Sequence, residues 1–304
     1  MYKRQLIGGC TVPGIPEGVG GGGGAITGTG LVITDFSPDF SSVRSGDSLE
    51  LYLEVENRGQ APAVGPFAYL YGINMDDWGS DDSDRVHYLA NDLSGTLEPP
   101  DENLGVPGEV SDTSWSLTAP DVDPGIKSTY EPRVRVFYKY TNGATARIPL
   151  ISESEADRMR SAGEALPSSV DIITTAGPIG VEVTARAPVI IKSGSDNSFR
   201  TIVRLTNLMG GSPYNPDKHG DTEIGQDDLN IVRATLSVSS GTIDCGDGPD
   251  TSFTKDVSLR RGTGTVSCDI DPPDTVATRE DMTLKVELEY GYMVDSVTSI
   301  EVTG

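Results

Sequence analysis

Two acidic loops hold the residues whose chemistry is easiest to name. Each brings five carboxylates close together: Asp76, Asp77, Asp81, Asp82 and Asp84 in the first, and Asp217, Asp221, Glu223, Asp227 and Asp228 in the second. Ca²⁺ takes six to eight hard oxygen ligands from flexible loops, so both are candidate Ca²⁺ sites, and Ca²⁺ is the one cofactor we consider. Neither loop has the EF-hand spacing. Because the chain has 46 acidic residues, chance clustering into ordinary solvated surface is the alternative.

Catalytic chemistry is not predicted. The two histidines, His87 and His219, lie in polar loops away from any Ser or Cys nucleophile motif, and we expect both to be solvated. The glycine-rich stretch before residue 30 contains the letters of a dinucleotide-binding pattern, but it follows no predicted strand and opens no predicted helix. No carboxylate pair stands out as a general acid and base. We therefore expect a protein that is not an enzyme, with no catalytic residues.

The cysteines indicate export. Cys245 and Cys268 flank a segment that reads as two strands, and a bridge between them would close a loop of about 24 residues, worth about 3 kcal/mol. Such bridges persist outside the reducing cytosol. A metal site is disfavoured because neither cysteine belongs to a C-x-x-C pair and no histidine is near in sequence. Two free buried thiols are the alternative.

The N-terminus predicts a lipid anchor. Residues 6–10 read LIGGC and precede a glycine-rich tract, an order that resembles a lipoprotein signal with Cys10 as the lipidated residue. Only Leu6 and Ile7 remain of an apolar stretch that should run to 7–15 residues, so we expect a truncated signal. The prediction is an extracellular protein held at the cell-surface membrane through this lipid. An exported protein without lipid and a cytosolic protein are the alternatives.

The net charge of −23 argues against nucleic acid as a partner, because a phosphate backbone would be repelled and no basic stripe offsets that repulsion. No run of 18 or more apolar residues is present.

An internal repeat determines the predicted architecture. Residues 133–150 align with 285–302 at an offset of 152, stacking Tyr138 on Tyr290 and Tyr140 on Tyr292. Residues 48–59 align with 198–210 at an offset of 150. The matched blocks alternate apolar and polar residues, as strands with one buried face do. The chain is therefore predicted to be all-β, with two copies of one antiparallel β-sandwich.

The domain plan follows from that repeat. We expect residues 133–150 to form a closing hairpin that turns at Asn142-Gly143, a type I′ turn signal, and 284–302 to form its counterpart. Ser152 and Glu155 have the spacing of a helix capping box. The expected segments are a signal and tether at 1–29, a first sandwich at 30–151, a helix and linker at 152–179, and a second sandwich at 180–304.

A family resemblance supports this plan. The strand SLELYLEVENRG at 48–59, a Pro- and Ala-containing third strand and a Tyr-rich closing segment resemble the CARDB-type and related immunoglobulin-like modules of archaeal and bacterial cell-surface proteins. Tandem copies behind a lipobox-like segment are similar to surface lipoproteins of small-genome archaea. The resemblance implies adhesion, binding or scaffolding toward a surface protein or glycan. The alternatives are a repeat unit of a surface layer or filament, and accessory domains of a truncated extracellular enzyme.

Overall fold

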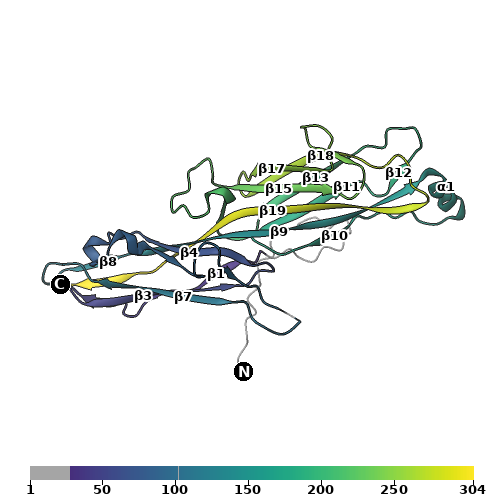
Figure 1. Cartoon of the computed structure of the whole chain (residues 1–304). Coiled ribbons are helices and arrows are strands. Elements are labelled where there is room, and N and C mark those ends of the chain that lie inside the picture. The colour runs from purple at the N-terminus through teal and green to yellow at the C-terminus, as the bar shows by residue number, and fades with distance from the viewer. Residues whose placement is uncertain (1–27, 102) are drawn as a thin grey trace, which may run out of the picture.

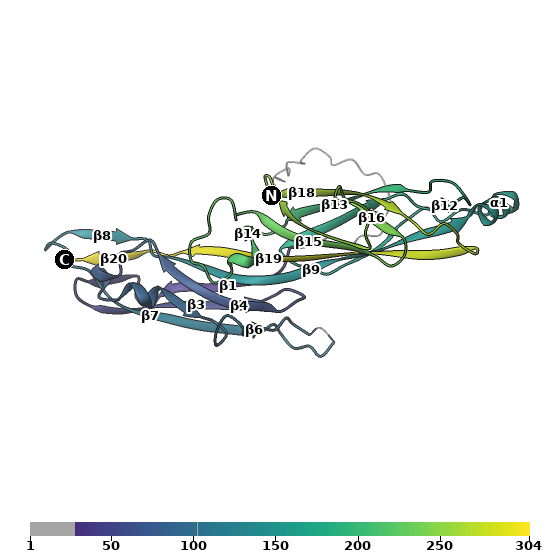
Figure 2. The ribbon, with the colours of Figure 1, turned by 45° about the horizontal axis from the view of Figure 1, so that its top comes forward.

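The computed structural model describes residues 28–101 and 103–304, and these residues fold as an all-β protein, as the sequence predicts. Two lobes lie end to end in an elongated body (Figure 1). Residue 304 lies at one end, and the helix α1 (Glu153–Ala162) lies at the other end in both views (Figure 2). The hydroxyl of Ser152 caps this helix by accepting a hydrogen bond from the backbone N–H of Glu155.

Two small sheets belong to the first lobe. One is antiparallel, in the order β1 (Leu31–Pro38), β3 (Ser48–Asn57) and β7 (Val110–Thr118). The other has the order β2 (Ser42–Arg44), β20 (Ile300–Thr303) and β8 (Lys127–Tyr130), with β2 and β20 parallel. The first lobe is therefore completed by the last strand of the second repeat.

The second lobe has its own antiparallel sheet. Its order is β11 (Ile179–Ala185), β13 (Phe199–Asn207), β18 (Thr263–Asp271) and β16 (Thr242–Asp244). Its strands β11, β13 and β18 are the repeat equivalents of β1, β3 and β7, at offsets close to 150.

A central sheet runs through both lobes. Its order in the described residues is β17 (Ser252–Ser258), β15 (Ile231–Val238), β19 (Arg279–Val297), β9 (Arg133–Ser152), β4 (Ala63–Tyr71) and β5 (Val86–Tyr88). Four short strands add to it: β6 (Thr96–Leu97) on β4, β14 (Ser212–Tyr214) on β19, and β10 (Asp171–Thr174) and β12 (Val189–Ile191) on β9.

The two expected closing hairpins are wrong. Strand β9 continues through Asn142 and Gly143 without turning, and β19 pairs with it antiparallel along its whole length. Asn142 is buried, and a Cβ on Gly143 would collide with the carbonyl oxygen of Val286 on β19. Glycine at position 143 therefore allows the two long strands to lie close together. The long-range pairing of these strands overrides the local turn preference of Asn-Gly.

The repeats are related by a pseudo-twofold axis between β9 and β19. Lys139 is paired with Gly291, and Gly291 is also its repeat equivalent, 152 positions later. Each long strand begins in one lobe and ends in the other (Figure 1). The strands of each lobe therefore come from both repeats, an exchange that the expected boundaries at 151 and 180 do not anticipate.

One hydrophobic core extends through both lobes and includes the four buried tyrosines of β9 and β19. A second, smaller cluster lies near the same axis and consists of Phe67, Phe137, Tyr214 and Met293. Because both clusters join residues of the two repeats, the lobes share their packing as well as their strands. No helix in the described residues is long and apolar enough to cross a bilayer.

Candidate functional site

The first acidic loop uses its carboxylates to order itself. It forms the short 3₁₀ helices η1 (Asp76–Trp78) and η2 (Asp82–Arg85), and Asp81 and Asp84 form a reciprocal capping box at the second. Asp82 is 2.7 Å from the guanidinium of Arg85. The five carboxylates stay exposed and do not converge.

The second acidic loop behaves in the same way. Asp217 lies in η3 (Pro216–Lys218) and forms an ion pair with Arg233 at 2.7 Å, which lowers the pKa of the Asp217 carboxyl. Asp228 accepts a hydrogen bond from the side chain of Asn215 at 3.1 Å. Across residues 28–101 and 103–304, no three His, Cys, Asp or Glu side chains are placed to hold a metal ion. Ca²⁺ binding at the two loops stays a prediction.

The predicted disulfide is confirmed. Cys245 and Cys268 are bonded, and their Cα atoms are 4.1 Å apart. Asp244 on β16 pairs with Asp269 on β18, so the two cysteines are the next directly opposed residues of that ladder. The two strands of the segment that follows Cys245 do not pair with each other as a hairpin, because β17 belongs to the central sheet and β18 to the sheet of the second lobe.

Replacing both bridged cysteines by serine, Cys245→Ser with Cys268→Ser, is expected to lower the free energy of unfolding by about 3 kcal/mol, because the open chain regains loop entropy in the unfolded state. Urea unfolding of the two proteins measures the difference. Wild type unfolded in the presence of a reductant is the matched control and should move to the same midpoint. An unchanged midpoint in both experiments would contradict the expectation.

Both histidines differ from the expectation of solvated loop residues. His87 stacks on Trp115 with ring centroids 4.8 Å apart, and its Nδ1 is 2.7 Å from the hydroxyl of Thr113. His219 packs near the axis, where its Nδ1 is 2.9 Å from the hydroxyl of Tyr214. Burial lowers the pKa of His219 to about 4, so this imidazole is neutral at pH 7. Both rings are packing residues of the folded body.

Four tyrosines meet at the pseudo-twofold axis. Tyr138 pairs with Tyr292 and Tyr140 with Tyr290 across β9 and β19, and all four rings are buried. The hydroxyl of Tyr292 donates to the side chain of Asn207 at 2.8 Å. The hydroxyl of Tyr140 accepts from the backbone N–H groups of residues 60 and 61, both at 3.0 Å.

The other two hydroxyls break the symmetry. Tyr290 donates to the Oδ1 of Asn142 at 2.8 Å and accepts from the N–H of Ile179 at 3.3 Å. Its equivalent, Tyr138, lies near the backbone N–H of Leu31 but forms no hydrogen bond of good geometry with a described residue and donates to no described acceptor. The cause lies in the repeat, because the residue 152 positions after Asn142 is Val294, which has no acceptor.

Removing these two hydroxyls should therefore have different effects. Tyr290→Phe leaves the buried Oδ1 of Asn142 without its donor and is expected to cost about 1–3 kcal/mol. Tyr138→Phe removes a buried hydroxyl that donates to no described acceptor, so we expect it to be close to neutral or stabilising. Denaturant unfolding of the two matched variants decides this. Equal losses would show that the two hydroxyls are satisfied alike.

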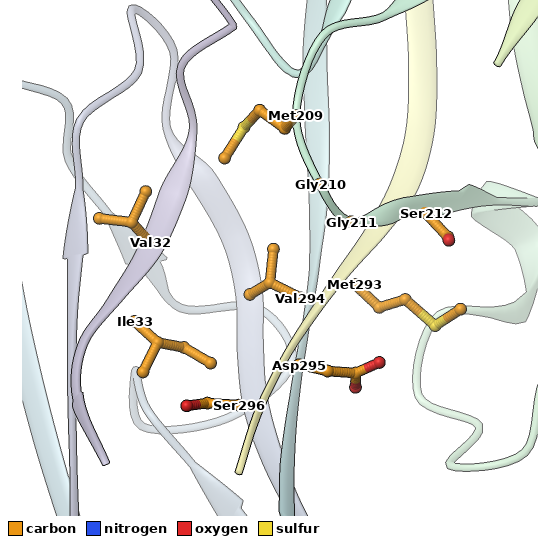
Figure 3. Close-up of a pocket in the computed structure, with 10 residues that line it drawn as sticks. All are labelled: Val32, Ile33, Met209, Gly210, Gly211, Ser212, Met293, Val294, Asp295 and Ser296. Carbon is orange, nitrogen blue, oxygen red and sulfur yellow. The ribbon is translucent and has the colours of Figure 1, made fainter.

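A groove lies between β1 and β19 in the first lobe. It encloses about 370 Å³ and is lined by Val32, Ile33, Met209, Gly210, Gly211, Ser212, Met293, Val294, Asp295 and Ser296. Figure 3 shows Val32, Ile33, Met209 and Val294 around one hollow, while Asp295 points to the other side of its strand. That carboxylate binds the guanidinium of Arg135 at 2.7 Å. The hollow therefore combines apolar side chains with a larger share of polar surface, and the sequence pattern did not identify it.

The groove follows an edge of β19 that no described strand covers beyond Met293. On the side away from β9, β14 pairs with β19 only as far as Met293, and no other described strand continues along Val294–Val297. At the equivalent place in the second lobe, β10 pairs with residues 144–147 of β9. Among the described residues, no strand of the first lobe takes the place that β10 takes in the second lobe.

The predicted lipidation residue, Cys10, lies outside the described residues. Comparison with family models finds no match, and comparison with curated proteins finds no relative. Among solved structures, the chain is similar to red sea bream transglutaminase, with 10% identity and a TM-score of 0.22. It is also similar to the secreted serine protease VesC from Vibrio cholerae, with 9% identity and a TM-score of 0.22, and to a mutant of Salmonella alpha-2-macroglobulin, with 10% identity and a TM-score of 0.23. These alignments cover 89%, 86% and 91% of this chain but 31%, 51% and 23% of those chains, and similarity this low identifies no function.

Proposed function

We propose that this protein is a non-enzymatic scaffolding module of the cell surface, anchored through Cys10, that holds its attachment points at a fixed separation. The observation that carries the proposal is the ladder between β9 and β19, which pairs residues 133–151 with 279–297 without interruption. A strand of 20 residues spans roughly 65 Å at about 3.3 Å per residue, which is long for a globular protein.

The shared strands make the body stiff. Two domains joined by an ordinary linker move relative to each other by default. In this chain, bending between the lobes would distort the ladder where Tyr140 pairs with Tyr290, in the middle of the shared core. The exchanged strand β20 adds a second connection, because it lies between β2 and β8 of the first lobe. Such a stiff body is suited to act as a spacer between attachment points.

An extracellular setting is supported by the Cys245–Cys268 bond, since such bonds persist in oxidising compartments. The net charge of −23 favours a well-solvated surface that resists non-specific association. For the non-enzymatic part of the proposal, the support is that both histidines and the paired carboxylates are engaged with structural neighbours.

The anchoring part is tested by detergent partitioning of the protein expressed from a complete gene. Wild type is expected in the detergent and membrane fractions, and Cys10→Ser is expected to release the folded protein into the aqueous fraction. Cys245→Ser with Cys268→Ser is the matched control, because it also removes cysteines but should leave partitioning unchanged. Wild-type protein that stays in the aqueous fraction would contradict anchoring.

A further inference from the structure

The second acidic loop, which spans residues 215–228 of the second repeat, packs across a strand of the first repeat. The loop closes at its base, where the N–H of Asn215 donates to the carbonyl of Asp228 at 2.8 Å. Beyond this base the ring of His219 lies against β4, because a Cβ on Gly65 would be 2.6 Å from its Nε2. Ile224 packs against the smaller apolar cluster. The two repeats therefore touch through this loop as well as through their long strands.

Strand β4 is shaped to receive the imidazole. Its register with β9 shifts between Val64 and Phe67, which marks a β-bulge. Gly65 lies in this bulge with a φ of +59°, a left-handed conformation that favours glycine. The rings of Phe67 and His219 have their centroids 5.7 Å apart. With its Nδ1 on the hydroxyl of Tyr214, the imidazole is enclosed by β4 of the first repeat and β14 of the second.

The surroundings of both ring nitrogens favour the neutral imidazole. Nδ1 and the hydroxyl of Tyr214 share one hydrogen bond at 2.9 Å. Nε2 is buried near the backbone of Gly65 but forms no hydrogen bond of good geometry with a described residue. A protonated imidazole donates from both nitrogens and carries a charge. Burying a charge without well-placed partners is costly, so a proton on His219 disfavours the packed position.

Charged and titratable groups face the ring from the strands that pack on it. From β9, Lys139 disfavours a protonated ring, although its ammonium is 3.4 Å from the carboxylate of Glu289. From β14, the hydroxyl of Tyr214 keeps its proton because burial raises its pKa. From β4, the backbone of Gly65 favours a proton on the ring. Burial outweighs this effect, and the pKa of His219 falls to about 4.

The neighbours within loops leave this balance in place. Lys218 and Asp221, which lie on either side of His219 in the second acidic loop, carry opposite charges. In the adjoining turn of the first repeat, the carboxylate of Asp92 accepts hydrogen bonds from the N–H and the hydroxyl of Ser94 at 2.7 and 2.6 Å. That carboxylate is therefore engaged within its own turn.

We propose that His219 is an acid-sensitive latch, which holds the second acidic loop on β4 while its ring is neutral and releases the loop when the ring is protonated. The loop opens about its base at Asn215 and Asp228, and its release uncovers the ring of Phe67. The ladder between β9 and β19 takes no part in the latch and stays paired. The latch depends on neither the proposed anchoring nor the proposed scaffolding role.

The direction of the pH effect follows from the two states of the loop. In the open loop the imidazole is solvated and titrates near its ordinary pKa of about 6.5. In the closed loop its pKa is about 4. The closed state is therefore fully favoured above about pH 6.5 and loses stability as the pH falls from there toward 4, because the open state binds the proton more tightly.

Hydrogen exchange followed by mass spectrometry tests the latch in the full chain. The amides of residues 216–228 are compared at pH 7 and pH 5, with each rate corrected for its intrinsic pH dependence. We expect their protection in wild type to fall by on the order of tenfold between these pH values. The amides of β9 near Tyr140 should keep their protection. Unchanged protection of the loop would overturn the proposal.

Two variants separate the histidine from other titrating groups. His219→Gln keeps a polar side chain that does not titrate, so its loop should be equally protected at both pH values. His87→Gln removes the other histidine of the chain and should keep the full wild-type response. A fall in His219→Gln as large as that in wild type would assign the response to carboxylates and overturn the latch.

A direct titration of the ring keeps the test decisive if glutamine itself opens the loop. In His87→Gln the imidazole signals in a nuclear magnetic resonance spectrum belong to His219 alone. We expect their titration midpoint to lie at least one pH unit below the ordinary value of about 6.5. A midpoint near 6.5 would show that the packed loop does not resist the proton, which would overturn the proposal.

Discussion

A chain shortened to end at Ser299 is expected to lose the packing of the first lobe, although the deleted residues belong to the second repeat. The side chains of Ile300 and Val302 are fully buried between β2 and β8. Removing a large buried side chain costs about 2–5 kcal/mol, so losing both costs on the order of 5 kcal/mol or more. That amount is comparable with the whole stability of many domains.

Tryptophan fluorescence reports this loss directly, because both tryptophans of the chain, Trp78 and Trp115, are buried in the first lobe. The rings of Trp78 and Tyr130 pack edge to face with their centroids 5.2 Å apart, and Tyr130 pairs with Ile300 across β8 and β20. Ile300→Ala should also lower the denaturant midpoint of unfolding that is followed by tryptophan emission. Val297→Ala, at a site 55% exposed, should leave this midpoint unchanged. An unchanged tryptophan transition in the shortened chain would mean that β20 does not complete the first lobe.

Tyr290→Ala is expected to destabilise both lobes together, by about 3–5 kcal/mol. Truncating a fully buried aromatic ring leaves a cavity that its neighbours fill only in part. This ring contacts those of Tyr140 and Tyr292 on the shared strands, so the cavity lies in packing that belongs to neither lobe alone. The loss should therefore appear in one cooperative transition.

Two probes separate this outcome from local damage. Tryptophan emission follows the first lobe and far-ultraviolet circular dichroism follows the whole chain, and their midpoints should move together in Tyr290→Ala. Tyr52→Ala, at an exposed position of β3, is the control and should leave both near wild type. Transitions that separate in the variant would indicate lobes that unfold independently.

Local patterns predicted much of the fold. The alternation of apolar and polar residues identified the strands, because one face of each sheet is buried, and the repeat identified two equivalent halves. The spacing of Cys245 and Cys268 predicted their bond, and Ser152 predicted the start of the helix.

The exchange between the lobes was not predictable in this way. A repeat fixes which strands are equivalent but not whether a strand completes its own half or the other, and β20 pairs with the other half. Likewise, Asn142-Gly143 carries a strong local turn signal, but a turn there would give up the pairing of β9 with β19 beyond it. Long-range pairing outweighed local preference at this point.

The candidate sites show the same limit. The acidic loops looked suitable for Ca²⁺ because carboxylates cluster in the sequence. In the structure, some of these carboxylates form capping bonds and ion pairs with Arg85 and Arg233, and Ca²⁺ binding stays a prediction. The groove beside β19 became visible only when the two lobes were compared.

The most direct test of the account is the distance between the two lobes in solution. Tyr52 and Ile202 are exposed repeat equivalents, one on the outer sheet of each lobe, and spin labels at Tyr52→Cys and Ile202→Cys in a Cys10→Ser background report their separation. Because β9 and β19 hold the lobes as one body, we predict a single narrow distance distribution in pulsed electron paramagnetic resonance. A broad or multi-peaked distribution would contradict the rigid, strand-exchanged scaffold.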